Sequence, residues 1–446
     1  MVPVLPILLL LLPAASFSPV AHAKGRHGHS LKPHAVCSGL RVFPSSNTTW
    51  LPLHHRRGPC SPSYSTGSRT STTTNILRRD QLRADDIRRK LSKKGDVTVS
   101  TALGTLENTL EYVVTVELGT PAVSQTLLVD TGSDLSWVQC RPCPVPPCHR
   151  QKDVVFDPSK SSTYSSFPCG SPACARLGSQ YTNGCSNGQC DYVVKYNDGS
   201  NTTGTYSSDT LTMTSSGVVS NFLFGCSHAE QGFSDPDRTD GILGFGGGTQ
   251  SLVSQTGGRA FSYCLPRTAS HTGFLTLGVP HISSSRFAVT PMYRFRNTPT
   301  FHVVILQAIT VAGRRLGVPP SVFSAGSIMD SGTIITRLPP TAYRALRAAF
   351  RAEMKMYPPA SPISILDTCF NLTGVRRVMV PRVALGFDRG AAVELHSSGI
   401  MQYGCLAFAP NGDDATPGII GNVQQRTLEV LYDVGGWAVG FRRGAC

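Results

Sequence analysis

The chain is 446 residues long, only 15% of its residues are charged, and it contains 43 glycines and 32 prolines. Such a chain is too long for one small core and suits two large lobes with extensions, while its many turn formers favour an all-β protein of short strands over a coiled coil or a disordered chain. The formal net charge of +14 suggests nucleic-acid binding. However, fifteen of the 41 basic residues and only four of the 27 acidic ones lie between residues 24 and 100. The remainder of the chain is therefore close to neutral and lacks the positive charge that would attract a nucleic acid.

The first residues have the pattern of a secretory signal peptide. Residues 2–14 are almost wholly apolar, and Ala21-His22-Ala23 supplies a small-x-small cleavage pattern. A chloroplast transit peptide is the alternative, but such segments are rich in Arg and Ser rather than Leu. We expect residues 1–23 to direct the chain into the secretory pathway, to an extracellular or vacuolar location. The apolar run is shorter than a membrane span and no later stretch reaches that length, so no membrane anchor is expected.

Residues 24–105 hold most of the basic charge and are predicted to form a prosegment. Leu77, Ala84, Ile87 and Leu91 recur near helical spacing, and Asn75 is a candidate cap for that helix. Five arginines surround the apolar positions: Arg78, Arg79, Arg83, Arg88 and Arg89. The helix either has an inhibitory role, with a basic side chain placed against acidic groups, or is a solvated basic helix without such a role.

Two related acidic turns are the most specific feature of the chain. Asp130-Thr131-Gly132-Ser133 and Asp330-Ser331-Gly332-Thr333 each follow an apolar run, and each is followed later by an apolar-apolar-Gly element, at residues 241–244 and 418–421. A single copy could be an ordinary Asx turn. The doubled order predicts two halves of similar plan that bring the two aspartates together. Two carboxyl groups held close cannot both ionise, so one keeps a proton while the other acts as a base.

Fourteen cysteines together with a secretory signal predict disulfide bonds. Cys37 and Cys60 lie in the expected prosegment, and a cluster occupies residues 140–190. A zinc ribbon in that cluster is the alternative, disfavoured by an oxidising compartment. Sequence alone leaves the connectivity open. The remaining twelve cysteines are Cys140, Cys143, Cys148, Cys169, Cys174, Cys185, Cys190, Cys226, Cys264, Cys369, Cys405 and Cys446.

Three further local features can be predicted. Asp198-Gly199, after Tyr196, is a hairpin turn signal. A helix is expected at residues 341–356, with Tyr343, Leu346 and Phe350 as its buried stripe. Asn47, Asn201 and Asn371 begin glycosylation sequons. The first lobe is expected at 106–275, with a cysteine-rich insert at 140–190, and the second at 276–446.

These stretches resemble the pepsin-like (family A1) aspartic proteases, in particular their plant nepenthesin-like branch. The resemblance covers about residues 111 to 446 and is carried by residues 112–121, 128–137, 328–333 and 420–425, with Tyr432-Asp433. The stretch at residues 54–62, HHRRGPCSP, is similar to a prosegment motif of one subgroup, which includes the chloroplast-nucleoid DNA-binding proteases. The family implies an all-β, bilobal fold with a cleft between two β-rich lobes, few short helices and an N-terminal prosegment.

The resemblance also implies a function and roles for single residues. The chain would be a secreted zymogen of an aspartic endopeptidase, monomeric and free of metal and cofactor, that hydrolyses protein or peptide substrates at acidic pH between Asp130 and Asp330. A basic prosegment side chain would neutralise the two aspartates until acid releases it. Thr131 and Ser331 would tie the two loops together, and Gly132 and Gly332 would allow tight turns. Ser133 and Thr333 would donate hydrogen bonds to the carboxylates. Tyr196 would lie in a mobile flap, with Trp137 behind it.

Similarity to nepenthesins implies six disulfides in the mature chain. They would be Cys140–Cys143, Cys148–Cys226, Cys169–Cys190, Cys174–Cys185, Cys264–Cys446 and Cys369–Cys405. The nested pair, 169–190 with 174–185, would hold the Ser- and Gly-rich insert in one shape. The bridge from Cys264 would fix the C-terminus.

Two other functions remain open from the sequence. One is a catalytically inactive inhibitor or binding protein on the same scaffold, such as the plant xylanase-inhibitor-like proteins, which commonly lose active-site elements. The other is a protease with an added DNA-binding role, although no nucleic acid is expected as a partner of the mature form. Both aspartate turns and Tyr196 are intact, which favours the protease.

Overall fold

The structure is a computed structural model. It describes residues 37, 49–64, 72–92, 112–144, 148–178, 180–196, 200–214, 217–233, 238–258, 260–278 and 286–446. The expected signal peptide at 1–23, the sequon at Asn47, the turn at Asp198-Gly199 and the expected boundary between residues 105 and 106 lie outside these ranges. No helix within the described residues has the length and apolar character to span a membrane.

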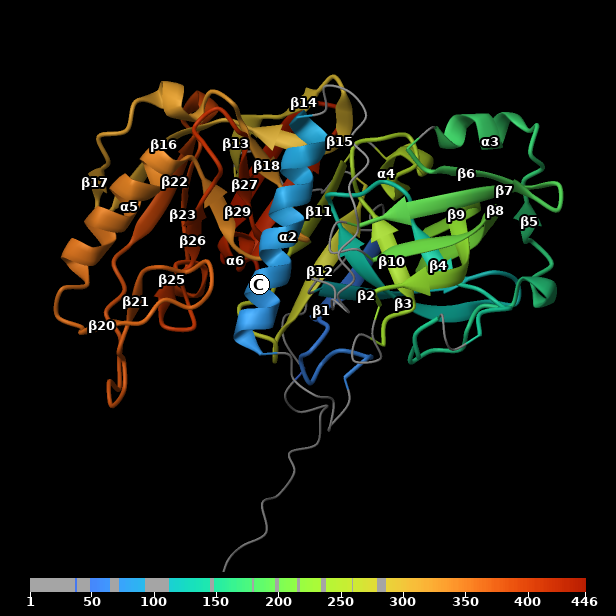
Figure 1. The fold of residues 1–446 in the computed structure, drawn as a ribbon, viewed down its shortest axis with the longest axis horizontal. Coiled ribbons are helices and arrows are strands. Elements are labelled where there is room, and N and C mark those ends of the chain that lie inside the picture. Colours follow the sequence, from blue (N-terminus) through green and yellow to red (C-terminus); the bar gives the residue numbers. More distant parts are fainter. Residues whose placement is uncertain are drawn as a thin grey trace, which may run out of the picture.

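Two lobes rich in β-strands lie side by side, with the helix α2 (Thr73–Ser92) between them (Figure 1). This architecture confirms the expected all-β, bilobal fold. The strands of the first lobe are β2 (Tyr112–Leu118), β3 (Val123–Asp130), β4 (Trp137–Gln139), β5 (Ser165–Ser166), β6 (Thr182–Ser186), β7 (Gln189–Lys195), β8 (Asn201–Thr214), β9 (Gly217–Gln231), β10 (Gly241–Gly244), β11 (Ala260–Cys264) and β12 (Thr272–Leu277). Strand β12 continues through residues 275 and 276, the expected junction between the lobes.

The second lobe is built from shorter strands and one long helix, α5 (Pro340–Glu353). Its strands are β13 (Ala288–Pro291), β14 (Tyr293–Phe295), β15 (Thr298–Val304), β16 (Leu306–Val311), β17 (Arg314–Arg315), β18 (Ser327–Met329), β19 (Thr336–Leu338), β20 (Pro359–Ala360), β21 (Cys369–Phe370), β22 (Val383–Phe387), β23 (Ala392–Glu394), β24 (Met401–Gln402), β25 (Cys405–Leu406), β26 (Phe408–Pro410), β27 (Gly418–Ile420), β28 (Leu428–Asp433) and β29 (Ala438–Arg443).

The other helices are short. They are α3 (Pro172–Leu177), α4 (Leu252–Gln255) and α6 (Asn422–Gln425), with single 3₁₀ turns at Pro158–Lys160, Pro320–Phe323, Asp388–Gly390 and Ser397–Gly399. Helix α5 buries Tyr343, Leu346 and Phe350, the stripe that the sequence predicts. It ends at Glu353, before the expected residue 356, because the chain turns at Met354, whose carbonyl accepts from the Tyr357 amide.

One large sheet continues from the first lobe into the second. Its strand order among the described residues is β13-β29-β28-β11-β12-β1-β2-β3-β10-β4-β9-β8-β7-β6, with β5 paired to β8. Strand β1 (Thr49–His55) belongs to the expected prosegment, yet it lies between β12 and β2, antiparallel to both. The segment is therefore built into the sheet that joins the lobes.

The disulfides of the first lobe differ from those that the resemblance implied. The structure pairs Cys140 with Cys226, and Cys143 with Cys148, in place of 140–143 and 148–226. Strands β4 and β9 are parallel neighbours, and Cys140 directly follows β4, where its amide donates to the Ser227 carbonyl. This register brings Cys140 to Cys226, with 5.3 Å between their Cα atoms, and leaves Cys143 and Cys148 to close the short loop between them.

The nested pair is also wrong, because the structure forms Cys169–Cys185 and Cys174–Cys190 instead of 169–190 and 174–185. Cys185 and Cys190 lie opposite each other on the β6–β7 hairpin, so neighbouring partners can exchange with little change in the chain path. Helix α3 packs Cys174 against the apolar cluster that contains the buried Cys190, which decides the pairing.

The remaining bridges are Cys264–Cys446 and Cys369–Cys405, as the resemblance implied, and Cys37–Cys60 in the expected prosegment. Every cysteine is bridged, so the 140–190 cluster offers no thiolate to zinc, and the described residues contain no group of side chains arranged to hold a metal ion.

Candidate active site

The two aspartate turns are supported in the same way. Strand β3 ends at Asp130, and β10 runs parallel beside it with Gly244 opposite Asp130. Strand β18 leads directly into Asp330, and β27 runs parallel beside it with Ile420 opposite Met329. The apolar-apolar-Gly elements are therefore the strands that flank each aspartate. The doubled order in the sequence corresponds to a doubled structure.

Hydroxyl groups tie the two turns together across the interface between the lobes. The Thr131 amide donates to Ser331 Oγ at 3.1 Å, and the Ser331 amide donates to Thr131 Oγ1 at 2.9 Å. The hydroxyls in turn reach the opposite strands, where Thr131 donates to the Met329 carbonyl and Ser331 to the Val129 carbonyl, both at 3.3 Å. These reciprocal bonds fix the two loops relative to each other, and hence the two carboxyl groups.

Each carboxyl group is held by its own turn. The Gly132 amide donates to Asp130 Oδ1 at 3.0 Å and Ser133 Oγ to Asp130 Oδ2 at 2.7 Å. The second turn repeats this geometry, with the Gly332 amide at 3.0 Å from Asp330 Oδ1 and Thr333 Oγ1 at 2.5 Å from Asp330 Oδ2. Both aspartates are fully buried. Donors to a carboxylate favour its ionised form.

Arg83, on helix α2, occupies the space between the two aspartates. Its Nη2 atom lies 2.6 Å from Asp130 Oδ1 and 2.8 Å from Asp330 Oδ1, and its Nε atom lies 2.8 Å from Asp330 Oδ2. One nitrogen therefore contacts the inner oxygen of both carboxyl groups. This is the space where a substrate or a water molecule would have to be for any reaction between the aspartates.

The charge of Arg83 changes the acidity of the site. Burial alone disfavours ionisation of Asp330. The charge and hydrogen bonds of Arg83, together with those of Thr333 and Gly332, outweigh burial, so the pKa of Asp330 lies below its usual value. Burial likewise acts against the charged form of Arg83, but Asp130 and Asp330 raise the pKa of Arg83 well above its usual value. Asp330 and Arg83 therefore stabilise each other's charged forms.

Helix α2 is fixed to the second lobe by an apolar face. Leu77 packs in a cluster with Ile334 and Ile335, and Ala84 and Ile87 pack in another with residues of β15, β18 and β27. All three side chains are buried, as their spacing predicts. The expected cap is corrected, because the Thr72 hydroxyl accepts from the amide of Asn75 and the helix begins at Thr73.

A buried ion pair adds to this apolar contact. Asp80 accepts from the Ile334 amide at 2.5 Å, from the Ile335 amide at 3.1 Å and from Arg337 Nη2 at 2.9 Å. Sequence reasoning missed both Asp80 and Arg337. The spacing of three residues between Asp80 and Arg83, which puts both side chains on one helix face, was the available signal.

The expected flap residues meet as a hydrogen-bonded pair. Trp137 Nε1 donates to the Tyr196 hydroxyl at 2.8 Å. Phe233 lies edge-on to both rings, with centroids 5.2 Å from Trp137 and 6.1 Å from Tyr196. On its other side Phe233 stacks on His149, whose Nδ1 is 2.5 Å from Glu230 Oε2. Phe233, His149 and Glu230 carry no motif in the sequence and were not predicted.

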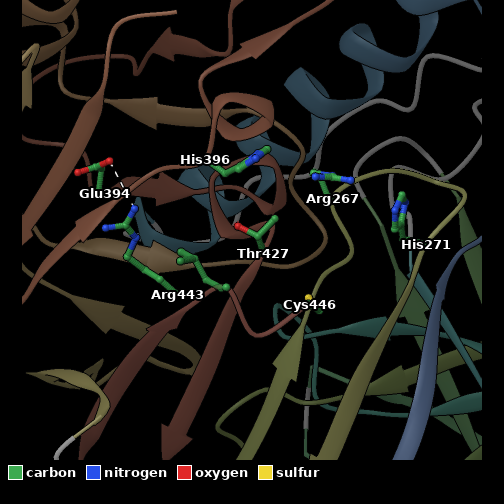
Figure 2. A pocket seen from close by; sticks show the side chains of 9 residues that line it. Arg267, His271, Glu394, His396, Thr427, Arg443 and Cys446 are labelled. Atoms are coloured by element: carbon green, nitrogen blue, oxygen red, sulfur yellow. Dashed lines mark hydrogen bonds and ion pairs between the residues drawn. The ribbon is translucent and has the colours of Figure 1, made fainter. Parts of the chain in front are cut away.

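Other candidate residues lie away from the aspartates. Asn201 begins strand β8 and donates through its side chain to Gln231 Oε1 at 2.8 Å, and Asn371 is exposed in the second lobe. A cavity of about 510 Å³ beside the C-terminus is lined by both basic and acidic side chains, among them Arg267, Arg443 and Glu394 (Figure 2). None of its lining residues belongs to the aspartate turns, so the chemistry of the pair does not involve it.

Paired carboxyl groups on two symmetric turns, at the interface of two β-rich lobes, define the aspartic protease class. Family models described as xylanase inhibitor N-terminal and xylanase inhibitor C-terminal match residues 112–279 and 302–443. An aspartyl protease family protein of Arabidopsis thaliana is 44% identical over 94% of this chain and 92% of its own. Aspartic proteinase nepenthesin-2 of Nepenthes gracilis is 36% identical over 75% of this chain and 78% of its own.

Solved structures share the architecture at lower identity. The crystal structure of basic 7S globulin from soybean has a TM-score of 0.60 and 19% identity, covering 89% of this chain and 95% of that one. This likeness shows the fold alone. The sequence relatives show the family: the chain belongs to the pepsin-like plant aspartyl proteases that include the nepenthesins, and it is an aspartic-type endopeptidase.

Proposed function

We propose that the chain is the zymogen of an aspartic endopeptidase that hydrolyses peptide bonds at acidic pH after its prosegment leaves the cleft. The observation that carries this proposal is the contact of one Arg83 nitrogen with the inner oxygens of both Asp130 and Asp330. Because one nitrogen contacts both inner oxygens, a single water molecule in its place can contact both carboxyl groups, as this chemistry requires.

With Arg83 withdrawn, a water molecule takes the place of its guanidinium group. The ionised aspartate accepts a proton from the water, the oxygen of which attacks the carbonyl carbon of the scissile peptide. The protonated aspartate donates to the carbonyl oxygen, and the leaving nitrogen is then protonated as the C–N bond breaks. Because the two carboxyl groups titrate as a unit, the roles of acid and base belong to the pair. Tyr196 would close over the bound peptide, with Trp137 behind it.

The prosegment supports a latent state at neutral pH. Arg83 blocks the aspartates, α2 covers them, and β1 holds the segment in the central sheet. The pKa of Asp330 is lowered in this state, so its ionisation stabilises the closed form at neutral pH. That stabilisation is lost as the pH falls through the lowered pKa. Uncovered, the two carboxyl groups repel each other when both are charged, so one of them takes up a proton more readily and acid favours release.

The test is to express the full chain, hold it at pH 7 and then acidify it in steps, following cleavage of a peptide mixture and the size of the chain. We expect no cleavage at neutral pH, cleavage and loss of the prosegment in acid, inhibition by pepstatin, and no activity in Asp130→Ala or Asp330→Ala. Activity that persists in either variant, or full activity of the uncleaved chain at pH 7, would contradict the proposal.

The remaining assignments are parts of the same proposal. Residues 1–23 would be a secretory signal, 24–105 the prosegment, and 106–275 and 276–446 the two lobes. The product would be a soluble extracellular, apoplastic or vacuolar monomer, with glycans at Asn201 and Asn371 as candidates, without bound nucleic acid. Mass spectrometry of the secreted protein gives its N-terminus and its glycan mass, and light scattering gives its size.

An inactive inhibitor on the same scaffold is the second candidate, favoured by the description of the family models and by the fold shared with the soybean globulin. The complete set of turn hydrogen bonds at Asp130 and Asp330 argues against it, since a chain without catalysis has no need of that geometry. Failure of the acidified chain to cleave any peptide would favour the inhibitor.

A further inference from the structure

The second lobe contains a site shaped for a carboxyl group, one helical turn from the aspartate pair. Asp80 of the prosegment fills it. The Ile334 amide donates to Asp80 Oδ1, and the Ile335 amide and Arg337 Nη2 donate to Asp80 Oδ2, at 2.5, 3.1 and 2.9 Å. Asp80 is fully buried, so all of these contacts are made away from water.

The donors of this site belong to the enzyme body and not to the prosegment. Ile334 and Ile335 directly follow the second aspartate turn, and Arg337 lies on β19. Arg337 is only 1% exposed, and its Nη1 atom donates to the Ile335 carbonyl at 2.7 Å, which orients the guanidinium. Its Nε atom is buried without a hydrogen-bond partner among the described residues. The guanidinium group is therefore held in place by the backbone of its own segment.

Removal of the prosegment would leave this site without its acceptor. Asp80 and Arg83 are three residues apart on one face of α2, so both leave the cleft when the helix does. The open cleft then presents the aspartate pair and, beside it, two backbone amides and a cation with no acceptor. Water is the acceptor left for these donors, and a substrate carboxyl group that replaces the water restores a charge-assisted set of hydrogen bonds.

We propose that the Ile334 and Ile335 amides and Arg337 form a substrate subsite for an acidic side chain close to the scissile bond. This inference rests on the proposed function, because the site opens only when the prosegment leaves. Asp80 occupies the subsite in the latent chain as Arg83 occupies the aspartates, so the prosegment imitates a substrate carboxyl group with one residue and blocks catalysis with another.

The subsite distinguishes an acid from the amide of the same shape. Burial raises the pKa of Asp80, although Arg337 and the two amides act in the opposite direction, so a bound carboxyl group can carry a proton in acid. In both protonation states its oxygens have lone pairs toward the donors, whereas an Asn or Gln turns an NH₂ group toward at least one of them. A site that loses hydrogen bonds to a buried charged group discriminates by about ten- to a hundredfold.

The experiment uses the acid-activated full chain and a set of peptides that differ at one position. Each peptide carries a single Asp in place of a neutral residue. Across the set, the Asp is placed at each position from the fourth residue before the cleaved bond to the fourth after it, and every Asp peptide has a matched Asn peptide. We expect kcat/KM for Asp over Asn to rise about ten- to a hundredfold at one position. In Arg337→Gln that ratio should fall to near one, in Arg337→Lys it should fall partly, and in Arg314→Gln it should be kept. Arg314 is the control because it pairs with Glu353 on the exposed surface.

The outcomes separate this inference from the proposed function. Cleavage without preference for Asp at any position overturns the subsite and leaves the protease proposal intact, even if the Arg337 variants do not fold. If nothing is cleaved, the protease proposal fails. The subsite is then measured by fluorescence anisotropy on the acid-opened full chain carrying Asp130→Asn, with labelled Asp and Asn peptides. Tighter binding of the Asp peptide supports the subsite, and equal binding of both peptides overturns it.

Discussion

Gly132 lies directly against Arg83. A Cβ atom at position 132 would be 2.6 Å from Arg83 Nη2 and 2.8 Å from Asp330 Oδ1. The backbone conformation of Gly132 is one that any residue can adopt, so space alone requires glycine here. The side chain missing at this position leaves room for Arg83. Under the proposed mechanism it also leaves room for the substrate or the attacking water once helix α2 has left the cleft.

Gly132→Ala is therefore expected to reduce kcat/KM of the activated chain by at least a hundredfold. The new methyl group would displace the carboxyl group of Asp330 or the water beside it, and a shift of about 1 Å at the reacting atoms costs about that factor. The loss of unfolding free energy should be only about 1–3 kcal/mol. Gly317→Ala is the control, since a Cβ there meets no atom within 4 Å. Normal activity of Gly132→Ala would show that the cleft is wider than this geometry requires.

Arg83→Gln in the full chain should move activation toward neutral pH. Without the cation, the pKa of Asp330 is no longer lowered, and two buried carboxyl groups face each other in the closed form. Protonation then occurs at a higher pH, and the prosegment is held less tightly. The measurement is the pH at which half of the chain loses its prosegment, which we expect to rise by about one unit or more.

Two further variants sharpen that experiment. Arg83→Lys keeps the charge but lacks the forked donors that reach both carboxyl groups, so an intermediate shift is expected. Arg78→Gln removes an exposed arginine of the same helix and should leave the activation pH unchanged. Equal shifts in Arg83→Gln and Arg78→Gln would mean that the total charge of the helix, and not the contact with the aspartates, sets the latency.

The sequence predicted the parts of the site that repeat. Asp130 and Asp330 could be found because each turn is followed by its own apolar-apolar-Gly strand, and parallel strands on either side of a turn fix where its side chain lies. The apolar stripe of α2 was visible for a similar reason, since helical spacing is a local property of the chain. The choice of Arg83 among five arginines was not local and depended on the register of α2 against the second lobe.

The residues that sequence reasoning missed are defined by contacts distant along the chain. Asp80 accepts hydrogen bonds from Ile334 and Arg337, which are more than 250 residues away along the chain. The predicted disulfide pairings were wrong for the same reason. Cys185 and Cys190 are cross-strand neighbours, so the sequence permits either as the partner of Cys169, and only the packing of α3 decides between them. Cys140 similarly required knowledge that β4 lies beside β9.

The corrected disulfides predict a ranking of stability. The Cys264–Cys446 bridge spans 182 residues, while Cys143–Cys148 spans five. In the chain-entropy model, loss of the long bridge costs up to about 5 kcal/mol of unfolding free energy and loss of the short one about 2 kcal/mol. Denaturant unfolding of Cys264→Ser/Cys446→Ser and Cys143→Ser/Cys148→Ser measures the difference. Peptide mapping should recover a 140–226 linkage, and recovery of 140–143 would contradict the structure.

Asp240 predicts how stability depends on pH. It precedes Gly241 of β10, accepts from the Thr126 amide and lies beside Asp153. Burial, with the nearby Asp153 carboxyl group, raises the pKa of Asp240 to about 8. A raised pKa means that the folded chain prefers the protonated group. The stabilisation is fully present below pH 3.8 or so and is lost as the pH rises toward 8.

Replacing Asp240 with Asn supplies a group that never ionises. At pH 4 the Asp240→Asn chain should unfold with about the same free energy as the natural one, because both groups are then neutral. At pH 8 the variant should be more stable, by on the order of several kcal/mol. The control is Asp191→Asn, on β7, which should follow the natural chain at both values. If Asp240→Asn instead loses stability equally at pH 4 and pH 8, the carboxyl group at position 240 is ionised throughout, and the protein owes no part of its stability in acid to that proton.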